Sequence, residues 1–479
     1  MLDILSRVVS WGNTIVWSYA LVYMLLGLGL YFTFKTRFVQ FRFITDMIQL
    51  LGEKVVSSVS GQDNSGQVSS FQAFCVSIAS RVGTGNLAGV AIAITVGGPG
   101  AVFWMWLVAL IGAASGFIES TLAQIYKVKD EDGNYRGGPA YYMDQALNQK
   151  WMGILFSFLL TFSFGLVFNA VQANTISYAF QEAFGINRLG VGIALVVFVS
   201  VIIFGGVKRI AKTVEKIVPV MAVGYLIIAL FIVLKNISAV PSVLALIFNN
   251  AFGLQEAVGG GLGATIMMGI KRGLFSNEAG MGSAPNAAAT AEVTHPVKQG
   301  LVQTLAVFTD TILICSATAF VIIISGAYTQ SGISGIQLTQ TALTTTVGNW
   351  ADIFIALAIL LFAFSSILGN YVYGETNIKF GNISNNWLLV YRIAVLGMVL
   401  FGSVAKISIV WSMADLSMGL MAFVNLIAIT FLAPIAAKAL KDYAQQKRRG
   451  EDPVFNRESI KDTTEVECWE QTDESSIGI

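Results

Sequence analysis

Long apolar runs separated by short polar segments dominate the chain. Eleven of these runs come close to or exceed the roughly 20 residues that a helix needs to cross a bilayer. They lie at about 14–34, 71–97, 100–125, 151–182, 189–206, 214–234, 259–291, 300–325, 351–374, 387–404 and 411–437. Lipid offers no hydrogen-bond partners to the backbone, so each run is expected to be helical. The pattern predicts an all-α polytopic membrane protein with about 11 transmembrane helices.

Two of the runs are interrupted by glycine and polar residues. The second run contains Gly83, Thr84, Gly85 and Asn86 between two apolar halves, and the seventh contains GIKRGLFSNEAG. Without the first run, the other ten divide into two groups of five, and each group opens with an interrupted helix. Five crossings reverse direction, so the two groups begin on opposite sides of the membrane. This arrangement is typical of an inverted-repeat transporter with two discontinuous helices.

The same division predicts the organisation of the chain. We expect an extra N-terminal transmembrane helix at 1–35, a cytoplasmic loop at 36–70, a first five-helix repeat at 71–235, an extracytoplasmic connection at 236–258, a second five-helix repeat at 259–437 and a partly disordered cytoplasmic tail at 438–479. The charge-free stretch from about 326 to 350 is expected to be an extracytoplasmic loop.

The distribution of Lys and Arg predicts on which side of the membrane each terminus lies. With the N-terminus outside, 21 Lys and Arg residues fall on the cytoplasmic side and four fall outside. Cytoplasmic segments are enriched in Lys and Arg, which favours an outside N-terminus and a cytoplasmic C-terminus. We expect a multi-pass protein in the plasma (inner) membrane of a prokaryote.

Composition excludes several classes of protein. Hydrophobic residues make up 55% of the chain, charged residues 12%, and the mean hydropathy is +0.69, which excludes a soluble globular protein. One His and three Cys argue against a haem, a zinc site or a disulfide framework. There is no GxSxG, HExxH or TVGYG motif, so a membrane enzyme and a filter-type channel are both disfavoured. No cofactor and no nucleic-acid partner are expected.

The interruptions suggest a cargo. A helix broken inside lipid leaves backbone groups unpaired unless something else satisfies them. Freed amides at a half-helix N-terminus suit a carboxylate, and freed carbonyls suit an ammonium group or Na⁺. Glycines that only permit close helix packing are the alternative. Because both groups of five open with an interruption, the pattern favours a site for an amino acid and a cation.

Four stretches carry a family resemblance. RVGTGNLAGVAIAITVGGPGAVFWMW, RGGPAYYM, VQAN and GIKRGLFSNEAGMGSAPNAAA resemble the alanine/glycine:cation symporter family, also called sodium:alanine symporters. The resemblance extends over nearly the whole membrane region. It implies the inverted-repeat fold of the neurotransmitter sodium symporters and Na⁺-coupled uptake of alanine or glycine. Coupling to H⁺, or exchange of another small amino acid, is the alternative.

The resemblance also implies a Na⁺ site. By comparison with related symporters, its ligands would be the carbonyls of Ala79, Val82 and Phe362 and the side chains of Ser365 and Ser366. Five such oxygens suit a hard cation. The alternative for the serines is a hydrogen bond back to a carbonyl of their own helix. Asn86 would belong to a second Na⁺ site, for which the sequence offers no other matching ligands.

The expected substrate site surrounds the first interruption. The backbone of Gly83, Thr84 and Gly85 would bind the carboxylate, beside Asn86. The remaining lining would come from Gln172 and Asn174 of the VQAN stretch and from Phe275, Ser276 and Asn277 of the other interrupted helix. These amides could instead join helices, as could Asn169.

Charged residues inside apolar runs are further candidates, because each one costs energy unless it is paired or near water. They are Arg81, Glu119, Lys271, Arg272, Glu278, Asp310 and Arg392. We expect Arg81 at a cytoplasmic gate and an internal pairing of Lys271 and Arg272 with Glu278. Glu119 and Asp310 are expected to be neutralised by a basic partner or by protonation, or to carry protons in the H⁺-coupled alternative.

Overall fold

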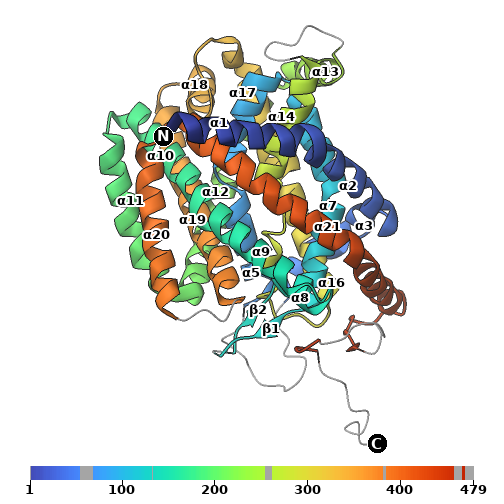
Figure 1. Cartoon of the computed structure of the whole chain (residues 1–479). Helices are drawn as coiled ribbons and strands as arrows, with labels where there is room; N and C mark the ends of the chain where they lie inside the picture. The colour runs from blue at the N-terminus through green and yellow to red at the C-terminus, as the bar shows by residue number, and fades with distance from the viewer. Residues whose placement is uncertain are drawn as a thin grey trace, which may run out of the picture.

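The computed structural model describes residues 2–53, 68–131, 133–253, 261–380, 385–457 and 466–469. Helices fill nearly all of these ranges, and their only sheet is a hairpin of β1 (Val128–Lys129) and β2 (Tyr135–Arg136), paired antiparallel. Figure 1 shows a bundle of long helices, with the hairpin at one end and α18 at the other.

The helices before residue 254 are α1 (Leu2–Asn13), η1 (Thr14–Leu21), α2 (Val22–Lys35), α3 (Val39–Arg42), α4 (Ile44–Leu51), α5 (Ser70–Arg81), η2 (Gly85–Gly89), α6 (Val90–Gly97), α7 (Ala101–Ile125), α8 (Pro139–Gln145), α9 (Lys150–Leu160), η3 (Thr161–Phe168), α10 (Asn169–Phe184), α11 (Arg188–Ile203), α12 (Gly206–Lys235), η4 (Ile237–Ala239) and α13 (Val240–Ala251). After residue 260 they are α14 (Leu262–Asn277), α15 (Pro285–Ala288), α16 (Pro296–Val307), η5 (Phe308–Cys315), α17 (Ser316–Ser325), η6 (Ala327–Thr329), α18 (Ile336–Val347), α19 (Trp350–Phe380), α20 (Asn385–Val404) and α21 (Ile407–Arg448).

The structure confirms an all-α polytopic membrane protein. In the described residues, eight helical stretches are long and apolar enough to cross a membrane, and the bent pair of α5 with η2–α6 forms a ninth. The two other expected spans, at 189–206 and 259–291, correspond to α11 and α14, each 16 residues long. An inverted-repeat relation between 71–235 and 259–437 stays a prediction.

Three expected connections contain helices. α3 and α4 lie in the expected loop 36–70, α13 in the connection 236–258 and α18 in the stretch 326–350. In α18, Ile336, Leu338 and Leu343 are buried, so tertiary packing orders a segment that its polar composition predicts to be a loop. The parts of these connections at 54–67 and 254–260 lie outside the described residues.

The described part of the expected tail is ordered, and partial disorder of the tail stays a prediction. α21 continues to Arg448, beyond the expected end of the last span. The Phe455 N–H then donates to the carbonyl of Thr294 (2.9 Å), and the Trp469 indole donates to the carbonyl of Gln124 (3.0 Å). Phe455 and Trp469 are both buried, so apolar contact holds this segment on the bundle. Residues 458–465 and 470–479 lie outside the described part of the chain.

Candidate functional site

The first break separates α5 from η2. α5 ends at Arg81, and Val82 has an extended backbone (φ −82°, ψ 91°). The helix resumes after Thr84, at an angle of 46° to α5. Residues 79–86 are all buried. Non-helical backbone at membrane depth is tolerated only inside protein or beside a water-filled cavity, and this break meets that condition.

Two side-chain amides bind the backbone at this break. The Gly83 N–H donates to Oδ1 of Asn86 (3.0 Å), while the Thr84 N–H (3.1 Å) and hydroxyl (2.6 Å) donate to Oε1 of Gln172. Four of the residues expected at the substrate site therefore meet at one point. Oxygens are favoured at the start of a half-helix, so a substrate carboxylate would compete with Gln172 for the Thr84 donors.

Glycine is required at the break because other helices approach closely. A methyl group on Gly83 would overlap Oγ of Ser366 in α19. One on Gly85 would lie 3.1 Å from the Phe275 ring and 3.2 Å from Cα of Ser276. Optimal contacts between carbon atoms are about 3.5–4.0 Å, so neither position accommodates a larger residue without movement. The first break thus contacts both α19 and α14.

Asp310 links the two interrupted helices. Its Oδ1 accepts hydrogen bonds from the amide of Asn86 (2.7 Å) and the hydroxyl of Ser276 (3.1 Å), and its Oδ2 accepts one from Thr311 (2.8 Å). The sulfur of Cys315 lies 3.3 Å from Nδ2 of Asn86. Asp310 is fully buried. The carboxylate of Asp310 and the hydroxyl oxygens of Ser276 and Thr311 are ligands that suit a hard cation.

The sequence identifies Asp310 only as an intramembrane charge. Its contact with Asn86 spans 224 positions of the chain, and no local pattern predicts it. The signal that points to Asp310 as functional is the cost of a carboxyl group inside an apolar run.

The second break lies later than GIKRGLFSNEAG suggests. α14 is regular through Asn277, and non-helical backbone follows at 278–284. A Cβ on Gly269 or Gly273 would collide with α7, so these two glycines allow close packing and do not interrupt the helix. The non-helical segment begins with Glu278, at φ 57°, and continues through two glycines at positive φ.

Glu119 of α7 holds this non-helical segment. Its carboxylate accepts hydrogen bonds from the N–H groups of Gly280 and Gly282, both at 3.1 Å. Asn425 donates to the same carboxylate (2.7 Å) and to the Gly280 carbonyl (3.0 Å), and itself accepts a hydrogen bond from Tyr142 (2.5 Å). Backbone and side-chain amides therefore satisfy the buried carboxyl group, and among the described residues no basic side chain lies at ion-pair distance from it.

The expected Na⁺ ligands come from two neighbouring parts of the structure. Ala79 lies in the last turn of α5, which packs against α19, and Val82 begins the first break. On α19 the hydroxyls of Ser365 and Ser366 both donate to the carbonyl of Phe362, at 2.8 and 3.0 Å. The serines thus adopt the back-bonded arrangement, and a bound cation would replace those hydrogen bonds. Cation binding here stays a prediction.

Two expected substrate residues contact other groups. The amide nitrogen of Asn174 donates to the carbonyls of Gly402 (2.7 Å) and Ala405 (2.9 Å), so its side chain joins α10 to the end of α20. Oδ1 of Asn277 accepts a hydrogen bond from the Ala279 N–H (3.0 Å) at the end of α14. Neither contact brings these amides to the first break.

The expected pairing with Glu278 is wrong. Arg272 binds both carboxylate oxygens of Asp415 in α21 at 2.5 Å, and Lys271 lies 3.5 Å from the same group. Glu278 instead accepts a hydrogen bond from the hydroxyl of Ser80 (2.7 Å). Lys271 and Arg272 follow one another on a regular helix that passes α21, so both reach Asp415 before the break begins.

Arg81 is buried at the end of α5. Its Nη1 donates to the carbonyl of Gln303 in α16 (3.2 Å), while Nε and Nη2 have no hydrogen-bond partner among the described residues. Its expected role at a cytoplasmic gate stays a prediction.

Aromatic rings cover one side of the first break. Phe275 stacks on Phe168 with ring centres 4.6 Å apart, and its centre lies 4.8 Å from that of Trp411. The Arg272 guanidinium lies 4.6 Å from the Trp411 ring centre. A surface cavity of about 430 Å³ lies beyond, and Trp411, Arg272 and Asp415 are among its lining residues. The rings and the ion pair therefore separate this cavity from the break.

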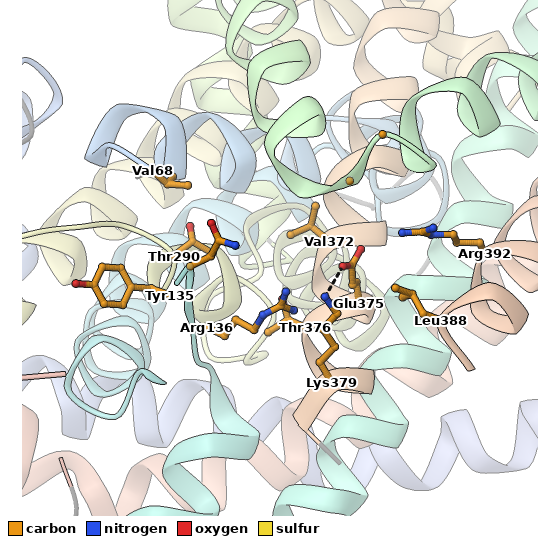
Figure 2. Close-up of a pocket in the computed structure, with 13 residues that line it drawn as sticks. Val68, Tyr135, Arg136, Thr290, Val372, Glu375, Thr376, Lys379, Leu388 and Arg392 are labelled. Atoms are coloured by element: carbon orange, nitrogen blue, oxygen red, sulfur yellow. Dashed lines mark ion pairs between the residues drawn. The ribbon is translucent and has the colours of Figure 1, made fainter. Parts of the chain in front are cut away.

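A second cavity, of about 510 Å³, opens near the hairpin, at the opposite end of the molecule from α18 (Figures 1 and 2). In Figure 2 the ion pair between Glu375 and Lys379 (3.2 Å) lies inside it, with Arg136 and Arg392 on either side. The C-terminal part of α19 lines this cavity, whereas Ile336 and Gln337 of α18 line the other one.

Comparisons with known proteins agree with this architecture. The model of the sodium:alanine symporter family matches residues 2–457. "Probable sodium/glutamine symporter GlnT" of Bacillus subtilis is 56% identical over 473 residues, covering 99% of this chain and 98% of that protein. "Amino-acid carrier protein AlsT" of the same organism is 56% identical over 455 residues, covering 95% and 96%.

One more distant relative and one solved structure were also found. "Sodium/alanine symporter AgcS" of Methanococcus maripaludis is 35% identical over 444 residues, covering 91% of this chain and 96% of that protein. Among solved structures, a manganese transporter of Eremococcus coleocola is 13% identical, with a TM-score of 0.47, and covers 85% of this chain and 94% of that one. The family match and the identities confirm the resemblance found in the sequence. The chain belongs to the sodium:alanine symporter family, whose members are membrane transporters and not enzymes.

Proposed function

We propose that this protein carries a small neutral amino acid, alanine or glycine, into the cell by alternating access, coupled to Na⁺. The observation that carries the proposal is the meeting of the two interrupted helices at Asp310, which bonds to Asn86 on one and to Ser276 on the other. A zwitterion and a cation need a carboxylate site and a set of oxygen ligands close together. The Thr84 donors and the Asp310 cluster supply both, and Asn86 adjoins each.

The aromatic cover favours a small cargo. Phe275 lies against Gly85, between the rings of Phe168 and Trp411. A rigid aromatic wall beside the carboxylate site would reject long side chains by steric overlap. The two surface cavities support alternating access, because a buried site between them could open to either one. We place the N-terminus outside and the C-terminus in the cytoplasm of a prokaryotic cell, on the distribution of Lys and Arg.

Glutamine is the second candidate cargo, because a relative that is 56% identical is named as a sodium/glutamine symporter. Glutamine would need Phe275 or Trp411 to move away from the first break. The fold does not fix the cargo, so the choice must be measured.

The test is uptake into proteoliposomes. Labelled alanine, glycine and glutamine are offered under an inward Na⁺ gradient, under an inward H⁺ gradient, and with neither. We expect alanine or glycine to accumulate only with the Na⁺ gradient. Accumulation of glutamine alone would contradict alanine or glycine as the cargo. Accumulation that needs the H⁺ gradient and not Na⁺ would contradict Na⁺ as the coupling ion. Uptake that needs internal amino acid and neither gradient would show exchange.

A further inference from the structure

The chain turns sharply at the end of α2. Arg37 and Phe38 both have positive φ, 55° and 59°, a conformation that residues with side chains rarely adopt. Hydrogen bonds to Thr33 help to hold the turn. The Phe38 N–H donates to the carbonyl of Thr33 (2.8 Å), and the Gln40 amide donates to the Thr33 hydroxyl (3.0 Å). Such backbone persists only where surrounding contacts enforce it, and here it directs α3 back against α7 (Figure 1).

One face of the segment 34–53 is fixed to the bundle. Val39, Met47 and Leu50 are buried on it. Both acidic residues of the segment bind other helices: Asp46 pairs with Lys447 of α21 (3.2 Å), and Glu53 pairs with Lys298 of α16 (2.5 Å). This side of the segment has its partners within the protein.

The other face is apolar and exposed. Phe34, Phe38, Phe41, Ile44 and Ile48 are each 43–64% exposed. Phe34 and Phe38 contact each other across the turn, with ring centres 5.3 Å apart, and Ile44 and Ile48 lie one turn apart on α4. We call these five exposed residues the apolar stripe. It continues the exposed apolar surface of α2, where Tyr23 and Leu30 face outward along a membrane span.

Cations border this stripe. Lys35, Arg37 and Arg42 are exposed, and within the described ranges none of them lies at ion-pair distance from a carboxylate. Because both acids of the segment are already paired, the charge left on its free face is positive. An exposed apolar stripe with basic residues beside it is the pattern of a segment that lies in a membrane interface.

We propose that residues 34–53 lie in the plane of the membrane interface, with the apolar stripe among the acyl chains and Lys35, Arg37 and Arg42 at the headgroups of anionic phospholipids. The segment is then a lipid-binding surface and not the cytoplasmic loop that the sequence predicts at this position. Glu53 joins it to Lys298 in the first turn of α16. The proposal is independent of cargo and coupling ion.

Spin labels test where the segment lies. Ile44→Cys and Ile48→Cys place a label on the apolar stripe, and Thr45→Cys and Gln49→Cys are matched controls on exposed polar positions of the same helix. Cys468→Ser is the background, because Cys75 and Cys315 are buried. The protein is reconstituted in phosphatidylcholine vesicles that contain phosphatidylglycerol.

We expect labels on the stripe to collide more often with oxygen than with a water-soluble nickel chelate, and labels at the two control positions to show the reverse. Nickel access at all four positions would place the segment in water. Stripe labels that neither reagent reaches would mean that protein, such as a second copy of the chain, covers it. Either result would overturn the proposal.

A second measurement tests the headgroups. Adding phosphatidylglycerol to phosphatidylcholine should raise the oxygen-to-nickel ratio at Ile48→Cys. The triple change Lys35→Gln, Arg37→Gln and Arg42→Gln should abolish this rise. The same triple change at Arg209, Lys212 and Lys216, exposed cations on α12, should leave it intact. If the oxygen-to-nickel ratio does not change when phosphatidylglycerol is added, the three cations do not bind anionic headgroups.

Discussion

At the scale of single residues, the site depends on atoms that lie within van der Waals or hydrogen-bond distance of a glycine backbone. Gly83 has no room for a methyl group because Ser366 of another helix occupies that space. Asp310 likewise acts through two hydrogen bonds to separate helices. Small changes at these positions should therefore affect transport more than changes of equal size elsewhere.

Gly83→Ala is expected to reduce transport strongly. The new methyl group must displace Ser366 or the backbone of the break, and overpacking of this kind costs about 1–3 kcal/mol. Uptake and thermal unfolding in detergent would measure the effect. Gly224→Ala on α12, where the added methyl group meets nothing, is the control and should behave as wild type. Wild-type uptake by Gly83→Ala would contradict the close approach.

Replacing Ser365 and Ser366 together by Ala should weaken Na⁺ activation more than it weakens folding. Loss of a hydrogen bond or ligand to a charged group costs about 1.5–3 kcal/mol, and 1.4 kcal/mol corresponds to about a tenfold change in affinity. Ser200→Ala, on the outer face of α11, is the control. Unchanged Na⁺ activation in a well-expressed double variant would remove the serines from the site, and Asp310→Asn would then test the alternative ligand.

At the scale of elements, partners on other helices hold the two interrupted segments in different ways. Asn86 and Gln172 bind the first break through side-chain amides, whereas the Glu119 carboxylate binds the second through two backbone N–H groups. α7 is therefore the scaffold for the second break, and its buried Glu119 carboxyl group belongs to that scaffold.

Glu119→Gln should destabilise the segment 278–284. A Gln side chain presents an NH₂ group to one of the two N–H donors, and a buried donor left without an acceptor costs about 1–3 kcal/mol. We expect a lower unfolding temperature and faster hydrogen exchange in this segment. Glu131→Gln, at an exposed position, is the matched control. Equal exchange in both variants would show that Glu119 does not hold the break.

At the scale of the whole molecule, the C-terminal segment connects distant parts of the chain. Phe455 packs against His295, which begins α16, and Trp469 caps the end of α7. The C-terminal segment therefore contacts both α7, which holds the second break, and the start of α16.

Docking of this segment should weaken below about pH 6.5. Burial lowers the pKa of His295, and the hydrogen bond from its ring to Asp442 only partly offsets this effect. The undocked state then binds more protons than the docked state between the lowered pKa and the ordinary value, so docking is fully stable above that window and is lost as the pH falls. Protonation of Nδ1 would also remove the acceptor for the Val297 N–H.

The pH dependence of docking can be measured by hydrogen exchange of residues 449–457. The exchange rates are compared at about pH 7.5 and about pH 5.5, after correction for intrinsic rates. His295→Asn keeps a capping acceptor but cannot titrate, so the difference between the two pH values should disappear in that variant. A pH difference that persists in His295→Asn would assign the effect to another group.

The sequence by itself determined the helical membrane class, most of the helices long enough to span a membrane and the place of the first break, because hydropathy and glycine spacing are local properties. The sequence also identified the family through the resemblance. It placed Thr84, Asn86 and Gln172 together at one expected substrate site. The Na⁺ ligands Ala79, Val82, Phe362, Ser365 and Ser366 remain predictions from the sequence.

Tertiary structure decided the rest. It placed the second break after Asn277, directed Asn174 to α20, paired Arg272 with Asp415 and brought Asp310 to Asn86. Each of these outcomes depends on which helix lies opposite a given face. Hydrogen bonds and ion pairs form only within a few ångströms, and residues that are far apart in the chain reach that distance only when the helices pack.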